Sequence, residues 1–552
     1  MKTLKLDDEF FGLIEQERKT STIRLITDEN KNDDYPRDSY LRFLSCKKGS
    51  FKSATVQILS TRNIKYSEIT EEVCTPEGFI NIKDLKDNLK KYYSGISEDS
   101  DLRVIDFRLH RPNDDIQIVY EGIAQETFDK AIVEIERDLG WGSWTDDFPD
   151  EVWTLLETKR ECLDKKVGVE IVDSNRESQT ITVRIPAKNI DWQYNGVSAL
   201  LSLVAGGVLG SSGVGKDMRV RSVNLSPSIR TQFSGPTLGI CGIRKLCKVY
   251  DRPIVTFTVK PRLGLDDDQF TRLCVEVAKG GVDIIEDDER LSNQEYSRLI
   301  DRAGKTINAL NNLDTLYSAN ISGRADKIVY VAEELIKIGV KLLKIDVLPV
   351  GFSGLQAVAE WLQSNNKEVG ITVYPAMNKL FERGMSRNFI LDLCRLCGAD
   401  MVYAGIPTFQ ESVNRSQDSA LFYKTAEYHR LLKREDGIHK QVLPTISTNI
   451  TPLNAAAYTR LLGKNVGFFV GAGIVAYGGG PKAGAELLMK TIEDAARNID
   501  EDTTEVKDKF FNNQDDKDYE QALNNCIGFG ELVKYSGVPS DIKKVFRNIK
   551  YL

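Results

Sequence analysis

The sequence predicts a (β/α)8 barrel that follows a smaller α+β domain. In the second half of the chain, eight short β-branched runs alternate with polar loops and amphipathic helical segments. Eight such units over about 240 residues match the number and length expected of this barrel. An open, doubly wound sheet is the alternative, but it seldom contains eight such units without a break. The preceding segment mixes strands and helices, which is typical of an α+β domain.

The predicted barrel occupies residues 251–500. Its eight strands are expected at 253–259, 282–286, 315–320, 341–347, 370–376, 399–405, 442–447 and 466–472. The segments between them, such as 267–281, 326–340 and 454–464, carry apolar residues at helical spacing. In a barrel of this kind, the residues that carry chemistry lie where the strands end.

The remaining segments are divided by their patterns. Residues 101–250 form the predicted α+β domain, with strands at 102–110, 166–173, 180–187 and 218–226. Residues 1–100 are an extra N-terminal region with a predicted strand and a Lys-rich helix, and no fold is assigned to them. Residues 501–552 read as a tail of short helices that could pack on the barrel.

The composition limits the classes of partner. A net charge of −7 over 552 residues, without a block of like charges, argues against nucleic acid and anionic membranes as partners. The first ten residues contain acidic residues and no apolar core segment, unlike a secretory signal. The most apolar stretch, 197–208, predicts a buried helix rather than a membrane span. Nine scattered cysteines are typical of reduced thiols in a cytoplasmic protein. Cys394 and Cys397 are interpreted as two buried thiols.

Three acidic residues follow the second predicted barrel strand in GGVDIIEDDE: Glu286, Asp288 and Glu289. Strand alternation directs Glu286 and Asp288 to the same side, and the following turn can bring Glu289 round. Carboxylates gathered in a barrel mouth repel one another unless a hard cation or a lysine neutralises them. The alternative is a solvated acidic loop.

Lys260 ends the first predicted barrel strand, in TVKPRLGL. Alternation directs its side chain inward, next to the acidic cluster. A lysine in this position can act as a base or as a Schiff-base nucleophile. The alternative is that it only compensates the charge of Glu286 or Asp288.

These two segments together resemble the large chain of RuBisCO, which has KPKLGL followed by GG-x-D-F-x-K-x-DE. The likeness continues in IDVLPVGFSGL, YPAMN, DMVYAG, LPTIST and GAGIVAYGGGP, and GWGSWT is similar to the TGTWT segment of the RuBisCO-type N-terminal domain. The chain is therefore identified as a divergent, RuBisCO-like member of this superfamily over roughly residues 101–500.

The resemblance implies roles for particular residues. Lys260 is the counterpart of the lysine that removes a proton from the substrate, and Asp288 and Glu289 match two magnesium-binding carboxylates. Glu286 replaces the lysine that is carbamylated in the family, so it could supply a permanent third carboxylate to Mg2+. The positions that grip the substrate include Ser143, Trp144, Ser447 and Gly473. The resemblance also implies a homodimer in which the small domain of one subunit completes the active site of its partner.

Several positions depart from the family pattern. Tyr374 and Pro375 replace a His-Arg pair after the fifth strand, and Tyr403 replaces the histidine of the sixth strand. The loop after that strand offers Gln410 where the family has the lysine that polarises carbon dioxide. Carboxylation of ribulose bisphosphate is therefore not expected.

Other departures concern charge and acid-base chemistry. Asn449 replaces a phosphate-binding glycine, so Arg262 and Lys379 are the nearest candidates for holding one anionic group. None of the three histidines falls at a predicted strand end. Acid-base chemistry in the barrel must therefore use Lys, Tyr, Asp or Glu.

Two functions are compatible with this pattern. The first is a magnesium-assisted enolase or isomerase that acts on a small anionic carbonyl substrate resembling a sugar phosphate. Lys260 would be its base, Tyr374 or Tyr403 a proton donor, and Arg262 and Gln410 would contact the substrate. The second is a catalytically degenerate member of the same fold with a binding or regulatory role, in which residues 1–100 could be an interaction module.

Overall fold

The computed structural model describes residues 2–15, 18–28, 30–37, 39–45, 53–109, 115–140, 148–210, 217–405, 427–447, 450–452 and 454–497. The chain divides into two compact units. The first contains residues 1–218 and 223–233, and the second contains residues 219–222 and 234–552.

The N-terminal part of the first unit is a five-stranded sheet with strand order β1-β3-β4-β5-β2. Its elements are β1 (Lys2–Leu6), α1 (Asp8–Glu15), β2 (Ser21–Leu25), β3 (Tyr40–Ser45), β4 (Ser53–Lys65), α2 (Glu71–Cys74), α3 (Ile82–Tyr92) and β5 (Asp101–Leu109). Phe10, Phe11 and Ile14 of α1 pack in one apolar cluster, and Leu85 and Leu89 of α3 pack in a second. Together with β5, the described part of residues 1–100 thus has a fold, which the sequence left unassigned.

A second sheet follows, with strand order β7-β8-β6-β9. Its elements are β6 (Asp115–Glu121), α4 (Phe128–Leu139), α5 (Asp150–Leu155), α6 (Arg160–Val167), β7 (Glu170–Asn175), β8 (Thr180–Pro186), α7 (Trp192–Ala205), α8 (Gly207–Gly210), β9 (Arg219–Leu225) and α9 (Pro227–Arg230). The hydroxyl of Tyr120 in β6 donates to the carbonyl of Val204 in α7 over 2.9 Å. Val197, Leu200 and Val204 are buried, as predicted for the apolar stretch 197–208.

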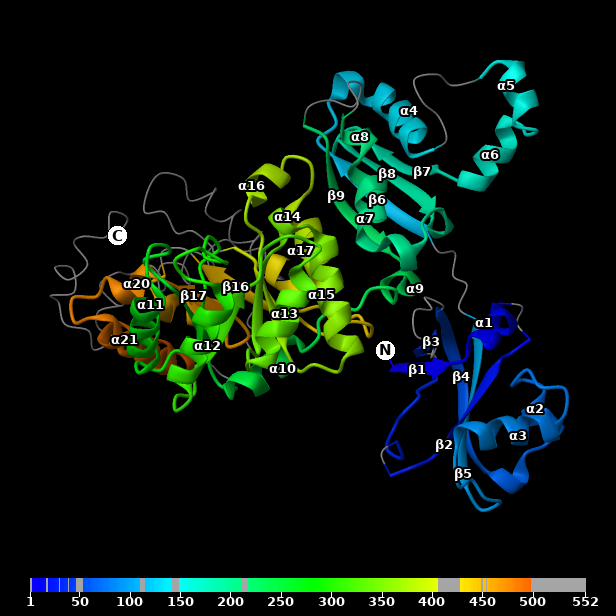
Figure 1. Cartoon of the computed structure of the whole chain (residues 1–552). Helices are drawn as coiled ribbons and strands as arrows, with labels where there is room; N and C mark the ends of the chain where they lie inside the picture. The colour runs from blue at the N-terminus through cyan, green and yellow to red at the C-terminus, as the bar shows by residue number, and fades with distance from the viewer. Residues whose placement is uncertain are drawn as a thin grey trace. The chain divides into compact units, whose positions relative to one another are not determined.

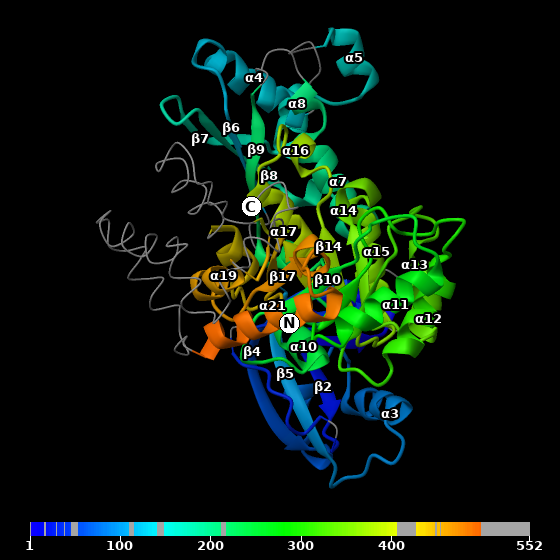
Figure 2. The same ribbon diagram turned by 90° about the vertical axis from the view of Figure 1, so that its left-hand side faces the viewer.

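The second unit contains a closed barrel of eight parallel strands, which confirms the predicted fold class (Figures 1 and 2). The strands are β10 (Ile254–Thr258), β11 (Ile284–Glu286), β12 (Leu316–Asn320), β13 (Leu342–Asp346), β14 (Gly370–Tyr374), β15 (Met401–Tyr403), β16 (Leu443–Ser447) and β17 (Gly467–Val470). All eight lie within the segments predicted as strands. The pairing of β10 with β17 closes the barrel.

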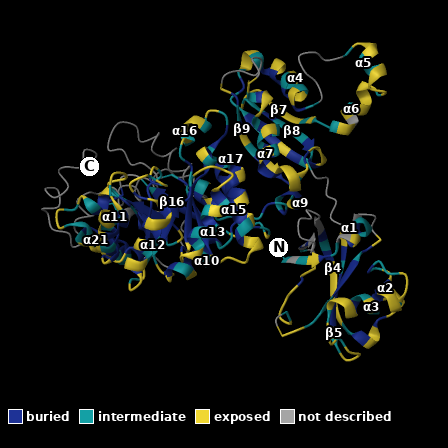
Figure 3. Cartoon of the chain, in the orientation of Figure 1, coloured by how far each residue is buried: buried dark blue, intermediate teal, exposed yellow. Residues whose placement is uncertain are grey.

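Helices surround these strands. They are α10 (Gly239–Cys247), α11 (Asp267–Ala278), α12 (Leu299–Leu310), α13 (Ile328–Lys337), α14 (Val347–Val350), α15 (Phe352–Ser364), α16 (Asn378–Phe381), α17 (Arg387–Leu396), α19 (Ala455–Leu462), α20 (Ala472–Val475) and α21 (Pro481–Arg497). The strands are buried on both faces, whereas the helices expose their outer sides (Figure 3). Fully buried strands are expected in a parallel sheet covered by helices.

Helix α10 closes the end of the barrel where the strands begin. Ile240, Ile243 and Cys247 of this helix form one cluster with strand-start residues such as Ile254 and Leu342. Because this end is filled with apolar side chains, polar chemistry is restricted to the opposite end, where the strands finish.

One predicted strand belongs to a different sheet from the one expected. The strand predicted at 102–110, within the α+β segment, forms as β5 but pairs with β2 and β4 in the N-terminal sheet. Alternation of apolar residues identifies a strand but does not identify its neighbours. The predicted C-terminal helices at 501–552 lie outside the described residues. Within the described part of the chain, no helix is long and apolar enough to span a membrane.

We predict that Gly370→Ala destabilises the barrel. A Cβ at this position would lie 2.6 Å from Cδ1 of Ile243 and 2.9 Å from Cδ2 of Leu342. Overpacking of this kind should lower the free energy of unfolding by about 1–3 kcal/mol in chemical denaturation. The matched control is Gly304→Ala in α12, whose Cβ would meet nothing nearer than 3.8 Å. It should be stabilising by up to about 1 kcal/mol, and equal effects of the two changes would contradict the prediction.

Candidate active site at the barrel mouth

The acidic cluster lies at the C-terminal end of β11, and alternation separates its members as predicted. Glu286, Asp287 and Asp288 are all fully buried. Glu286 and Asp288 contact lysines that approach from other barrel strands or their ends. Asp287 instead accepts hydrogen bonds from Arg302 Nη2 over 3.1 Å and from the Tyr317 hydroxyl over 2.7 Å. Asp287 therefore anchors β11 to its surroundings and is not available for chemistry.

Glu286 forms a buried ion pair with Lys344 of β13. The Lys344 Nζ lies 3.1 Å from Glu286 Oε1 and donates to the carbonyl of Asp287 over 2.9 Å, and Ser318 Oγ donates to Glu286 Oε2 over 3.2 Å. Burial raises the pKa of Glu286, and the charge of Lys344 opposes this effect. Burial alone would lower the pKa of Lys344, but the charges of Glu286 and Asp346 raise it above its ordinary value. The ammonium group is therefore a fixed positive charge inside the barrel.

Lys260 forms an ion pair with Asp288 at the open end of the barrel. The lysine side chain is 25% exposed, whereas Asp288 is completely buried. Burial alone would raise the pKa of Asp288, but the hydrogen bond from Lys260 holds it below its ordinary value. A Cβ on Gly471 would lie 2.9 Å from Cγ of Lys260, so the glycine leaves room for this side chain. The predicted inward position of Lys260 beside the carboxylates is thus the position observed.

The turn after β11 places Glu289 beside Arg262. The Arg262 Nη1 lies 3.7 Å from Glu289 Oε1, and both side chains are partly exposed. The amide of Asn320, at the end of β12, donates to the carbonyls of Asp288 and Glu289 over 3.1 and 3.2 Å. Asn320 therefore holds the turn that carries the last two acids.

The three predicted magnesium ligands are each matched with a cation of the chain. Glu286 contacts Lys344, Asp288 contacts Lys260, and Glu289 faces Arg262. Among the described residues, no three Asp, Glu, His or Cys side chains converge as a metal site would require. As arranged here, the cluster does not fit a magnesium ion.

Two residues of this centre, Lys344 and Asp346, were not identified from the sequence. Asp346 ends β13 and is buried, and its Oδ1 has no hydrogen-bond partner among the described residues. Burial raises its pKa to about 7, a shift that Lys344 opposes and that the negative charges of Glu289, Glu286 and Asp288 reinforce. Strand alternation in KLLKIDV would have directed both residues inward.

The two predicted tyrosines lie side by side on β14 and β15. The ring centroids of Tyr374 and Tyr403 are 5.4 Å apart, and Lys344 Nζ lies 5.7 Å from the Tyr374 ring centroid. Burial raises the pKa of Tyr374, so its hydroxyl stays protonated at neutral pH and can donate a hydrogen bond.

Arg387, at the start of α17, is a cation that the sequence analysis also missed. Its guanidinium carbon lies 5.6 Å from the Tyr403 ring centroid, and its Nη1 donates to Glu382 over 3.1 Å. The Nε and Nη2 atoms are buried and have no partner among the described residues. Unused guanidinium donors beside the end of β15 are suited to holding a carboxylate or phosphate.

Of the remaining residues predicted to contact the substrate, the structure describes some and not others. Ser447 ends β16 and is partly exposed. Gly473 is buried, and a Cβ there would lie 2.1 Å from the carbonyl oxygen of Ile450, so its absence of a side chain serves backbone packing. Ser143, Trp144, Gln410 and Asn449 lie outside the described residues. Cys394 and Cys397 are free, buried thiols, as predicted.

Comparisons with known proteins agree with this architecture. The family model described as ribulose bisphosphate carboxylase large chain, catalytic domain, matches residues 239–525, which is more than half of the chain. A ribulose bisphosphate carboxylase of Methanocaldococcus jannaschii is 25% identical over 399 residues, covering 70% of this chain and 92% of that protein. A ribulose bisphosphate carboxylase-like protein of Archaeoglobus fulgidus is 29% identical over 366 residues, covering 61% of this chain and 78% of that protein.

A solved structure shows the same fold. The dimeric archaeal Rubisco of Hyperthermus butylicus has a TM-score of 0.61 and 21% sequence identity, and the match covers 80% of this chain and 98% of that one. The relatives thus include proteins named as carboxylases and one named carboxylase-like, and their names do not distinguish between the two activities for this chain.

We predict that Lys344→Met is strongly destabilising, because it leaves the Glu286 carboxylate buried without its cation. The free energy of unfolding should fall by about 3–5 kcal/mol. Adding Glu286→Gln to this variant should recover most of the loss, because both charges are then absent.

Chemical denaturation of the two single variants and the double variant measures this coupling. Lys337→Met is the control, since this lysine is 58% exposed and should contribute less than about 1 kcal/mol. A double variant no more stable than Lys344→Met would show that the buried pair does not act as described.

Proposed function

Because the chain belongs to the ribulose bisphosphate carboxylase large-chain family, we propose that its barrel mouth enolises or isomerises a small anionic carbonyl compound and does not fix carbon dioxide. The proposal is carried by one arrangement, in which Asp288 holds the partly exposed amine of Lys260, and the charges of Asp288 and Lys344 both act on the buried Asp346. An amine, a carboxyl that titrates near neutral pH and a fixed cation are the groups that proton transfer next to a carbonyl requires.

Lys260 is the proposed catalytic base. In the ion pair with Asp288 the side chain is an ammonium, so it must first release one proton to solvent. The neutral Nζ would then accept a proton from the carbon beside the substrate carbonyl, as the resemblance implies, while Asp288 orients the amine by accepting its hydrogen bond. The electron pair released from the C–H bond moves onto the carbonyl oxygen. That oxygen becomes negatively charged and needs a positive group or a hydrogen-bond donor nearby.

Groups of the chain can meet this requirement. The field of the Lys344 ammonium, the Tyr374 hydroxyl and the protonated form of Asp346 all favour negative charge on the substrate oxygen. Asp346 can also return a proton to the neighbouring carbon or oxygen, because its pKa of about 7 lets it exchange protons at neutral pH. The proposed steps use these groups of the chain.

The anionic part of the substrate is assigned to Arg387. Its Nε and Nη2 atoms beside Tyr403 are buried and have no partner among the described residues, so they favour a carboxylate or a single phosphate. Arg262, which the sequence analysis favoured, is exposed and faces Glu289, so it is the weaker candidate. A reaction other than carboxylation is also supported by three departures from the family pattern, at Tyr374, Tyr403 and Gln410.

The assembly proposed for this chain is a homodimer with shared active sites. The relative from Hyperthermus butylicus is described as dimeric. In this proposal, Ser143 and Trp144 of one subunit would contact substrate held in the barrel of the other.

A binding or regulatory role is the second candidate. It is favoured by the pairing of every predicted metal ligand with a cation of the chain, which would also be the end state of a site that has lost its catalytic metal. The two candidates differ in whether any carbonyl compound undergoes proton exchange at the barrel.

We predict that Lys260→Met abolishes proton exchange without preventing substrate binding. Small phosphorylated or carboxylated ketones and sulfur-containing analogues are first screened for thermal stabilisation of the full chain. Compounds that bind are then followed by proton NMR in D2O with EDTA present. The wild type should exchange the proton next to the carbonyl, and the variant should be slower by at least about 100-fold.

Lys337→Met, an exposed change on α13, is the control for this experiment and should leave the exchange rate unchanged. An undiminished rate in Lys260→Met would remove the proposed base. Binding without exchange in the wild type would favour the regulatory role, and activity that EDTA abolishes would instead support magnesium.

We predict that Asp346→Asn changes the pH dependence of exchange. In the wild type, the exchange rate should change with pH with an apparent pKa near 7. This pH-dependent change should be absent from the Asn variant, because asparagine cannot titrate. Loss of this pH-dependent change distinguishes proton transfer from a structural role, because a structural defect would lower the rate equally at every pH.

The same substitution should raise stability at high pH. The folded state raises the Asp346 pKa from 3.8 to about 7, so the protonated acid is the form that folding favours. This contribution is fully present below about pH 4 and is lost as the pH rises through 7. Asp346→Asn should therefore have little effect at pH 4 but stabilise the protein at pH 8 by up to about 4 kcal/mol in chemical denaturation.

A further inference from the structure

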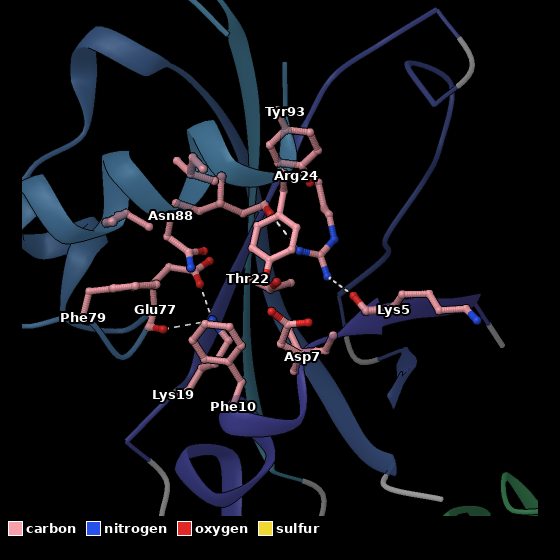
Figure 4. A pocket seen from close by; sticks show the side chains of 15 residues that line it. Lys5, Asp7, Phe10, Lys19, Thr22, Arg24, Glu77, Phe79, Asn88 and Tyr93 are labelled. Atoms are coloured by element: carbon pink, nitrogen blue, oxygen red, sulfur yellow. Dashed lines mark hydrogen bonds and ion pairs between the residues drawn. The ribbon is translucent and has the colours of Figure 1, made fainter. Parts of the chain in front are cut away.

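The N-terminal sheet contains a cavity that lies outside the residues matched by the family model. Its volume is about 350 Å³, and residues between Lys5 and Tyr93 line it (Figure 4). The lining comes from β1, α1, β2, α3 and the loop before α3. A hollow of this size is at the lower end of the range for small-molecule sites.

A buried ion pair lies in the wall of this cavity. Lys19 and Glu77 are 2% and 4% exposed, and the Lys19 ammonium contacts both the Glu77 carboxylate and the Glu77 carbonyl, the latter at 2.9 Å. Burial lowers the pKa of Lys19, and the charge of Glu77 opposes this effect. The backbone amides of Thr20 and Ser21 donate to the carbonyl of Pro76, which holds the two segments together.

One oxygen of the Glu77 carboxylate is not used by the ion pair with Lys19. Its Oε1 is buried and has no hydrogen-bond partner among the described residues. A buried carboxylate oxygen without a donor costs free energy. Because Glu77 lines the cavity, a ligand that carries an N–H donor can supply the missing hydrogen bond.

The charges of the lining favour a second, anionic group on the ligand. Lys5, Lys19 and Arg24 are cationic, and Asp7 and Glu77 are anionic, which leaves one net positive charge. The Arg24 guanidinium is held in place by donating to the carbonyls of Ile23 and Lys5, each over 2.9 Å. A guanidinium has five N–H donors, so a fixed one that donates two hydrogen bonds to backbone carbonyls can still donate to a carboxylate.

Aromatic rings complete the wall. Phe10, Phe79, Tyr92 and Tyr93 all line the cavity, and Tyr92 is 45% exposed. Rings of this kind favour an apolar or flat ligand body. The lining thus combines an acceptor for an amine, a cation for a carboxylate and an apolar wall.

We propose that this cavity binds a free α-amino acid with an apolar or aromatic side chain. Its ammonium donates to Glu77 Oε1, its carboxylate faces Arg24, and its side chain lies against Tyr92 and the phenylalanines. The site is independent of the barrel chemistry, since every residue that forms it lies between Lys5 and Tyr93, in the N-terminal sheet, its helices and the loops between them.

Calorimetric titration of the full chain with the apolar and aromatic amino acids tests the proposal. At least one should bind, and the corresponding amine without carboxylate and acid without amine should each bind at least tenfold more weakly. Binding by none of the amino acids, or equal binding of the amine or the acid, would overturn the proposed ligand class.

Two variants locate the binding and identify the contacts. Tyr92→Ala should weaken amino-acid binding at least tenfold, whereas Tyr194→Ala, an 86% exposed tyrosine on α7, should not. Glu77→Gln should weaken binding of the amino acid but not of the matched acid without an amine. If Glu77→Gln does not fold, Arg24→Gln, which should weaken both compounds together, serves instead. Unchanged affinity in Tyr92→Ala would place the binding elsewhere and refute the site.

Discussion

The barrel depends on neutralising a carboxylate inside a closed ring of strands. Glu286 on β11 is completely buried, and its cation, Lys344, reaches it across Ser318 of β12. An isolated buried carboxylate would be costly, and a buried pair is tolerated only when its other polar atoms are also bonded. The hydrogen bonds from Ser318 and to the carbonyl of Asp287 meet most of this requirement. The fold and the charge pattern at its mouth are therefore coupled.

The same strand serves two purposes because its side chains alternate. Asp287 faces Arg302 and Tyr317 and fixes β11, while Glu286 and Asp288 on the opposite face contact lysines. With these carboxylates already paired, the buried Asp346 has no ion-pair partner among the described residues, and burial raises its pKa to about 7. A group that destabilises the fold at neutral pH is consistent with a site retained for function.

The N-terminal sheet contains a second buried ion pair, Lys19–Glu77, with a different consequence. In the barrel, Glu286 Oε1 has no hydrogen-bond partner among the described residues but lies 3.1 Å from the Lys344 Nζ, and Ser318 donates to the other carboxylate oxygen. In the N-terminal sheet, Glu77 Oε1 also has no hydrogen-bond partner among the described residues, but Glu77 lines a cavity. Burying these charges costs free energy in both units. In the barrel the charged pair is enclosed by neighbouring strands, whereas in the N-terminal sheet it borders the proposed binding site.

By itself, the sequence determined the features that depend on local periodicity. The eight barrel strands and the inward direction of Lys260, Glu286 and Asp288 follow from alternation along single segments. Only the tertiary structure decided which residues meet. The strand at 102–110 joined the N-terminal sheet, Lys344 was placed against Glu286, and Asp346 acquired its raised pKa from burial. The physical reason is that pairing, desolvation and charge compensation depend on groups far apart in the chain, which become neighbours only when sheets form and the barrel closes.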